Sequence, residues 1–178
     1  MDYEIRKAGE NDIPAVAGIY DRILAAEENG NAVIGWVRGV YPTEKTARAA
    51  LAAGDLFVLE AGGKICATAR VNQEQVPEYA GGDWQYPDAP ENEIMVLHTL
   101  VVDPQAAGRG FGKAFVSFYE AYAREHGCRY LRMDTNAINA AARRFYAKLG
   151  FHEAGIVGCT FNGIPGVRLV CLEKKLEF

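Results

Sequence analysis

Residues 97–113 constrain the fold of this chain most, because a strand pattern, three alternate glycines and a helix pattern follow one another there. Residues 94–102 are mostly β-branched and large apolar side chains, and Pro104 ends the run because proline cannot donate a ladder hydrogen bond. Beyond the glycines, aromatic residues recur at helical spacing: Phe111, Phe115, Phe118 and Tyr122. We therefore expect a buried strand, a tight loop and an amphipathic helix that begins close to Gly110.

The start of such a helix is suited to bind an anion. Its first backbone N–H groups lack intrahelical partners, and the helix dipole is positive there. Gly108, Gly110 and Gly112 have no Cβ, so a phosphate can approach the backbone, although the same glycines would also suit a simple tight turn. A dinucleotide G-x-G-x-x-G pattern fails, because Lys113 and Phe115 stand where its last glycine is required. A P-loop fails too, because alanine occupies its first glycine and its hydroxyl position.

Composition limits the class of protein. With 178 residues and 49% apolar content, the chain is expected to form a single domain over residues 1–178. It has no long apolar segment and no signal-peptide order at its N-terminus, so we expect a cytoplasmic protein without a membrane partner. Four widely spaced cysteines predict neither a disulfide framework nor a metal site. A net charge of −4 without a basic stripe argues against nucleic acid as a partner.

The elements expected along the chain alternate between strands and helices. Strands are expected at residues 3–7, 55–60, 64–71, 94–102, 130–135, 152–160 and 167–173. Helices are expected at residues 13–24, with Asp12 as the cap, at 43–53, from Gly110 onward, and at 139–148. The order β-α-α-β-β-β-α-β-α-β-β predicts an α+β fold with a largely antiparallel sheet.

Two segments resemble the GNAT superfamily of N-acetyltransferases. Ala107-Gly-Arg-Gly-Phe-Gly112, which follows a strand, is similar to the acyl-CoA pyrophosphate loop of that superfamily, [QR]-x-x-G-x-[GA]. Residues 139–151, N-A-A-A-R-R-F-Y-A-K-L-G-F, are similar to its N-x-x-A-x-x-x-Y-x-x-x-G-F stretch. The two motifs stand in the order of the superfamily, and its element order extends over nearly the whole chain. The resemblance therefore implies an α+β fold with a GNAT-like mixed, largely antiparallel central sheet flanked by helices. It also implies acetyl-CoA as the cofactor.

The pyrophosphate loop departs from the family pattern at one position. If the pattern is aligned so that the helix begins at the aromatic stripe, Ala107 stands where the pattern has glutamine or arginine. We call this alignment the first frame. The frame that begins at Gln105 satisfies the pattern, but it begins the helix too early for the aromatic stripe that starts at Phe111. We prefer the first frame, because phosphate binding of this kind depends mainly on backbone N–H groups.

The resemblance also assigns cofactor contacts, residue by residue. Leu100, Val101 and Val102 would border the pantetheine arm, where the strand separates from its neighbour. The pyrophosphate would lie on Ala107, Gly108, Arg109, Gly110, Phe111, Gly112 and Lys113. Asn139, Ala142 and Tyr146 would complete the cofactor site. Ordinary sheet core for the three strand residues, and solvated surface cations for Arg109 and Lys113, are the structural alternatives.

Catalytic roles follow from the resemblance and from acid–base chemistry. A tyrosine at the position of Tyr146 protonates the departing sulfur in the family, and a phenol of pKa about 10 can stabilise a developing thiolate of pKa about 8.5. An amine acceptor of pKa about 10 must lose a proton before it attacks. His98, an imidazole of pKa about 6.5, is the first candidate base, and Glu93 is the competitor. Packing against the sheet is the alternative for Tyr146 and for His98. We expect direct attack without a covalent enzyme intermediate, with the oxyanion held by a backbone N–H near Val102.

The acceptor is suggested by an acidic segment. Residues 72–93 carry six carboxylates and no lysine, arginine or histidine, interleaved with Tyr79, Trp84 and Tyr86. This segment would suit a cationic acceptor, although a solvated loop with packed aromatics fits equally. We predict an acetyl-CoA-dependent N-acetyltransferase that acts on a primary amine of a small molecule. A non-catalytic acyl-CoA-binding or sensor domain, and acetylation of a protein N-terminus or lysine, are the alternatives. Whether the protein forms a homodimer is left open.

Overall fold

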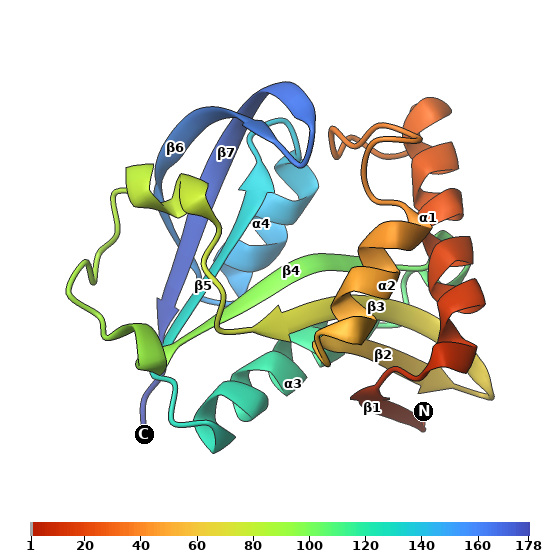
Figure 1. Ribbon diagram of the computed structural model, residues 1–178, viewed down its shortest axis with the longest axis horizontal. Helices are drawn as coiled ribbons and strands as arrows, with labels where there is room; N and C mark the ends of the chain where they lie inside the picture. Colours follow the sequence, from red (N-terminus) through yellow and green to blue (C-terminus); the bar gives the residue numbers. More distant parts are fainter. Residues whose placement is uncertain (1) are drawn as a thin grey trace. The chain divides into compact units, whose positions relative to one another are not determined.

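The computed structural model describes residues 2–178 and has the predicted element order. The strands are β1 (Tyr3–Lys7), β2 (Leu56–Ala61), β3 (Lys64–Asn72), β4 (Ile94–Val102), β5 (Tyr130–Asn136), β6 (His152–Phe161) and β7 (Ile164–Lys175). The helices are α1 (Ile13–Glu28), α2 (Glu44–Ala52), α3 (Phe111–Glu125) and α4 (Ala140–Lys148). The strand order is β1-β2-β3-β4-β5-β7-β6, with β4 and β5 parallel and the other registered pairs antiparallel. The predicted fold class, a mixed and largely antiparallel sheet flanked by helices, is confirmed (Figure 1).

The chain divides into two compact units. The first consists of the residues up to Ala32, Trp36–Val71 and His98–Tyr119. The second consists of Val33–Gly35, Asn72–Leu97 and Glu120–Phe178. Strand β4 and helix α3 each contribute residues to both units. Within residues 2–178, no helix has the length and the apolar character needed to span a bilayer.

In the first unit, helices cover both faces of the sheet. α1 and α2 lie next to each other (Figure 1) and pack on one face in a buried apolar cluster. The cluster contains Ile13, Val16, Ile19, Tyr20, Ala47, Ala50, Leu56, Val58 and Val101. Side chains alternate across a strand, so Phe57 points to the opposite face. Its ring lies 5.2 Å from the ring of Phe118 in α3.

The buried stripe of α3 differs from the predicted one. Phe111 and Phe115 are buried as expected, but Tyr119 is fully buried and the predicted Phe118 and Tyr122 are only half-buried. The buried positions recur every four residues, so the stripe turns slowly around the helix. The aromatic spacing therefore predicted the helix correctly and its buried face only in part.

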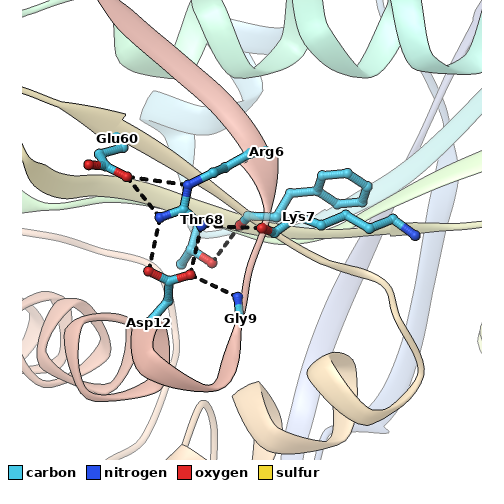
Figure 2. Close-up of polar contacts among 7 residues, drawn as sticks. Arg6, Lys7, Gly9, Asp12, Glu60 and Thr68 are labelled. Atoms are coloured by element: carbon cyan, nitrogen blue, oxygen red, sulfur yellow. Dashed lines mark hydrogen bonds and ion pairs between the residues drawn. The ribbon is translucent and has the colours of Figure 1, made fainter.

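Asp12 stands at the N-cap of α1, as predicted, but its carboxylate does not cap that helix. It accepts the backbone N–H of Gly9 at 2.8 Å and two hydrogen bonds from the Arg6 guanidinium, at 2.8 and 3.1 Å. Figure 2 shows Arg6 between this carboxylate and that of Glu60, which accepts at 2.8 Å. Hydrogen bonding by Arg6 lowers the pKa of Asp12, although burial opposes the shift. The aspartate thus joins β1 and β2 to the start of α1.

In the second unit, β5 pairs with two strands over different lengths. Its parallel ladder with β4 covers Tyr130 to Arg132, whereas its antiparallel ladder with β7 continues to Asn136. Arg132 lies opposite Glu173 on β7, and the two side chains form a buried ion pair. The residues of β5 beyond Arg132 therefore lie past the end of the β4 ladder.

Candidate active site

The loop that precedes α3 has the geometry of an anion cradle. Gly108 and Gly110 have φ angles of +79° and +78°, a left-handed conformation that favours glycine. A Cβ on either residue would extend into open space, with no protein atom within 4 Å. α3 begins at Phe111, so the N–H groups of its first turn lie directly after this loop. The start at Phe111 agrees with the frame that places Ala107 at the polar position of the motif. These residues fit a pyrophosphate.

Cations stand beside the cradle. Arg109 packs over the ring of Phe111 at 4.7 Å, and Lys113 is exposed on the first turn of α3. Both belong to the first unit, like the glycines. The arrangement places positive charge near the N-terminus of the helix, where an anion is favoured.

Asp103 anchors the beginning of the loop. It is buried, and Arg22 of α1 donates two hydrogen bonds to its carboxylate, at 2.9 and 2.7 Å. The backbone N–H of Gln105 donates a third at 3.0 Å. Burial by itself would raise the pKa of Asp103, but these hydrogen bonds outweigh it and the pKa is lowered. A cavity of about 460 Å³ lies next to this pair, and the Arg6 and Arg22 guanidinium groups that line it are paired with carboxylates.

The predicted pantetheine residues lie at the end of β4 in the first unit. Val101 is buried in the cluster under α1 and α2, which is the sheet-core alternative, whereas Leu100 and Val102 are half-buried. His98 is also half-buried on this strand. Thr99, which lies between His98 and Leu100, has a φ of +52°, an outlier for a β-branched residue.

The second predicted motif lies on α4 in the second unit. Asn139 caps the helix, because its Oδ1 accepts the Ala142 N–H at 3.0 Å. Tyr146 is buried, with its ring 5.0 Å from that of Phe145 and 5.8 Å from that of Phe151. Burial, and then the negative charge of Asp134, raise the pKa of the Tyr146 hydroxyl. The phenol therefore keeps its proton at neutral pH.

Asp134 is a candidate residue that the sequence did not single out. It is half-buried on β5, two residues past the end of the β4 ladder, and the Tyr79 hydroxyl donates a hydrogen bond to it at 2.6 Å. Burial and the charge of Glu78 raise the pKa of Asp134 to about 6, while the Tyr79 hydrogen bond opposes the shift. An aspartate inside an apolar strand pattern is the sequence signal that could have indicated it, but its partner Tyr79 is 55 residues away.

Glu93, the other predicted carboxylate, has a different environment. It is half-buried in the second unit and lies 3.7 Å from Arg129, measured from its Oε2 to the guanidinium Nε. The structure thus groups Glu93, Asn139, Ala142 and Tyr146 in the second unit. It groups His98, residues 100–102 and residues 107–113 in the first.

The model of the acetyltransferase (GNAT) family matches residues 41–151, which is more than half of the chain. The chain belongs to the GNAT acetyltransferase family. A mycothiol acetyltransferase from Cellulomonas flavigena is 32% identical over 89 residues, which is 46% of this chain and 26% of that protein. The matched region thus covers about a quarter of the length of this relative.

Solved structures agree with the fold. A GNAT-family acetyltransferase from Streptococcus agalactiae has a TM-score of 0.80 at 21% identity, covering 99% of this chain and 96% of that one. An acetyltransferase from Salmonella typhimurium, solved with acetyl-CoA, has a TM-score of 0.66 at 19% identity, covering 98% and 94%. As a member of this family, the chain carries an N-acetyltransferase domain that uses acetyl-CoA.

In this GNAT domain, the aromatics of the acidic segment are packed internally. Tyr79 is buried, and its backbone carbonyl accepts the Trp84 indole N–H at 2.7 Å. The Arg132 guanidinium lies 4.2 Å from the centre of the Trp84 ring, and the ammonium of Lys175 lies 5.2 Å from that of Tyr86. The aromatic faces thus meet cations of the protein itself, which corresponds to the packed-aromatic alternative.

Proposed function

We propose that this GNAT domain transfers the acetyl group of acetyl-CoA to a primary amine of a small molecule by direct attack. The observation that carries the proposal is the half-buried carboxyl of Asp134, with a pKa of about 6. At neutral pH such a group is mostly ionised, and it can accept the proton that an ammonium must lose before it attacks. Acetyl-CoA supplies the acetyl group as a thioester.

The cofactor would be held mainly by backbone groups. The glycine cradle and the first turn of α3 would bind the pyrophosphate, with Arg109 and Lys113 adding positive charge. Because this binding depends on N–H groups, the alanine at position 107 need not weaken it. Residues 100–102 would border the pantetheine arm, and Asn139 and Ala142 would contact the cofactor from α4.

Tyr146 would stabilise the leaving sulfur. Its raised pKa means that the phenol is protonated when the thiolate develops. Complete proton transfer to a thiolate of pKa about 8.5 would be unfavourable, so stabilisation would come from hydrogen bonding and a shared proton.

Asp134 is our first candidate for the base, ahead of His98 and Glu93. Glu93 lies 3.7 Å from the Arg129 guanidinium, so its carboxylate already has a cation of the protein as a partner. His98 stays a candidate, because histidine is the most common general base in enzymes.

The raised pKa values of two cysteine thiols favour direct attack over a cysteine-bound intermediate. Burial raises the pKa of Cys128 and of Cys159, and the charge of Glu93 adds to the shift at Cys128. The thiolate is the nucleophilic form of cysteine, and a raised pKa reduces its population. Neither residue is thus activated for attack on a thioester.

The remaining parts of the proposal concern the setting of the enzyme. We propose that residues 1–178 act as a single domain, that the protein works in the cytoplasm, and that membranes and nucleic acids are not its partners. A net charge of −4 supports the last point.

A thiol-release screen tests the proposed function. The full chain is incubated with acetyl-CoA and with small amines, amino acids, amino sugars, polyamines, and peptides that offer a free N-terminus or a lysine. We expect release of free thiol with a small amine and a sequential kinetic pattern. Release with peptides alone would support the protein-acceptor alternative, and ping-pong kinetics would contradict direct attack.

The acidic limb of the pH–rate profile should belong to Asp134. As the pH falls through about 6, the carboxylate gains a proton and can no longer accept one from the amine, so the rate should fall. The variant Asp134→Asn should lose most of the activity, by about 10²-fold or more, together with this limb. The measurement is kcat against pH with the amine that the screen identifies.

Stability and two parallel variants serve as controls. The pKa of Asp134 is higher in the folded than in the unfolded chain, so its contribution to stability declines as the pH rises from about 4 to about 6. Asp134→Asn should therefore be at least as stable as the wild type at pH 7.5. If the limb persists in Asp134→Asn and disappears in His98→Asn or Glu93→Gln, the base is that other residue.

A further inference from the structure

A strained residue stands in the middle of β4. Among residues 2–178, Thr99 and Asn162 are the non-glycine residues with positive φ. Asn162 lies in the turn between β6 and β7, and asparagine tolerates this conformation well. Thr99 is β-branched, and it lies inside a strand directly before Leu100. Such a conformation persists only where surrounding contacts determine it, and it often marks a functional position.

Tyr41 supplies one such contact. Its hydroxyl shares a hydrogen bond with the Thr99 hydroxyl, and both residues belong to the first unit. The ring of Tyr41 packs edge-to-face against Trp36, with 6.0 Å between the ring centres. The phenol is therefore held by its ring and touches β4 with its hydroxyl.

The turn that carries Tyr41 is itself fixed. Tyr41 donates its backbone N–H to the Val37 carbonyl at 3.0 Å, and Val37 donates back at 3.3 Å. Arg38 in the same turn forms ion pairs with Asp21 and Glu28 of α1. Residues 37–41 thus form a closed turn attached to α1, from which one hydroxyl reaches the strained strand position.

We propose that Tyr41 is a positioning residue for acetyl-CoA. Its hydroxyl holds Thr99 in the left-handed conformation, and this conformation sets the course of Leu100–Val102. These residues border the pantetheine arm in the proposed function, on which the inference rests. Without the hydroxyl, Thr99 relaxes toward extended backbone and the cofactor-binding edge shifts.

A double-mutant cycle on cofactor affinity tests the proposal. The dissociation constant of coenzyme A is measured by calorimetry on the full chain and on Tyr41→Phe, Thr99→Gly and the double variant. Tyr41→Phe keeps the ring and should weaken binding about tenfold, a factor that corresponds to one hydrogen bond. Glycine adopts positive φ without strain, so Thr99→Gly should bind within about twofold of the wild type. In that background Tyr41→Phe should have no further effect.

Two further variants serve as a second hydroxyl deletion and as a control. Thr99→Val removes the other hydroxyl at constant shape and should also weaken binding about tenfold. Tyr122→Phe, a tyrosine of α3 in the other unit, should leave binding unchanged. The proposal is overturned if Tyr41→Phe binds coenzyme A like the wild type, or if it weakens binding equally in the Thr99→Gly background. Coenzyme A binding needs no acceptor, so this outcome is independent of the acceptor screen, whereas a wild type that fails to bind would contradict the proposed function.

Discussion

Arg132→Met should lower the free energy of unfolding by about 3–5 kcal/mol, because it leaves the Glu173 carboxylate buried without its charge partner. The side chain of Arg132 is 6% exposed and that of Glu173 is fully buried. The guanidinium also donates to Gln75 at 2.8 Å and to the Tyr86 carbonyl at 2.7 Å. Domains have a total stability of about 5–15 kcal/mol, so the loss is a large share of it. Urea unfolding measures it.

The reason for so large an effect is that the pair holds the acidic segment on the sheet. Glu173 accepts the backbone N–H of Gln85 at 2.8 Å and that of Tyr86 at 3.3 Å. Arg132 contacts the same segment through the ring of Trp84. The two charges thus satisfy backbone groups of Gln85 and Tyr86 and hold this part of the acidic segment against β5 and β7.

Two variants separate burial of a charge from simple loss of an arginine. Arg132→Met combined with Glu173→Gln removes both charges and keeps an acceptor for the Gln85 N–H, so the double variant should be more stable than Arg132→Met alone. Arg48→Met breaks exposed ion pairs to Glu10 and Glu44 and should change stability by less than about 1 kcal/mol. Equal losses in Arg48→Met and Arg132→Met would contradict this account.

The elements of this fold were predictable because their signals are local. The apolar run before Pro104 predicts β4 with its observed bounds, and the cap Asn139 predicts where α4 begins. The end of α1 was predicted less well, because this helix continues to Glu28, beyond the expected end at residue 24. Parallel pairing of β4 with β5 could not be derived in this way. The ladder depends on which edges meet in space, and a resemblance to a family was needed to expect that the sheet is mixed.

The candidate site could be predicted only where its geometry depends on the local backbone. The glycines at 108 and 110 and the cap at Asn139 act through their own chain segment, so spacing reveals them. Asp134 acquires its properties from burial and from Tyr79, and Thr99 acquires its strain from the strand around it. Such properties arise from contacts between distant residues, which no local pattern records.

Tyr146→Phe should reduce kcat by at least about 10²-fold while the affinity for coenzyme A stays within about twofold. The substitution removes one oxygen and keeps the ring between Phe145 and Phe151, so packing is preserved. In the proposed mechanism, the hydroxyl stabilises charge that appears on sulfur only as the thioester breaks. An interaction of this kind lowers kcat when it is lost and leaves ground-state binding intact.

The pH dependence of the same enzyme adds a second readout. Burial and Asp134 raise the pKa of Tyr146, so the phenol stays protonated and the wild-type rate should not decline between pH 7 and pH 9 because of this group. Tyr130→Phe, a half-buried tyrosine of β5 that packs against Tyr86, removes a hydroxyl from the same unit and should keep full activity. A Tyr146→Phe enzyme with a wild-type kcat would assign the residue to packing alone. If kcat and the affinity for coenzyme A fell by the same factor, Tyr146 would instead be assigned to cofactor binding. Only an interaction confined to the transition state lowers kcat without lowering this affinity.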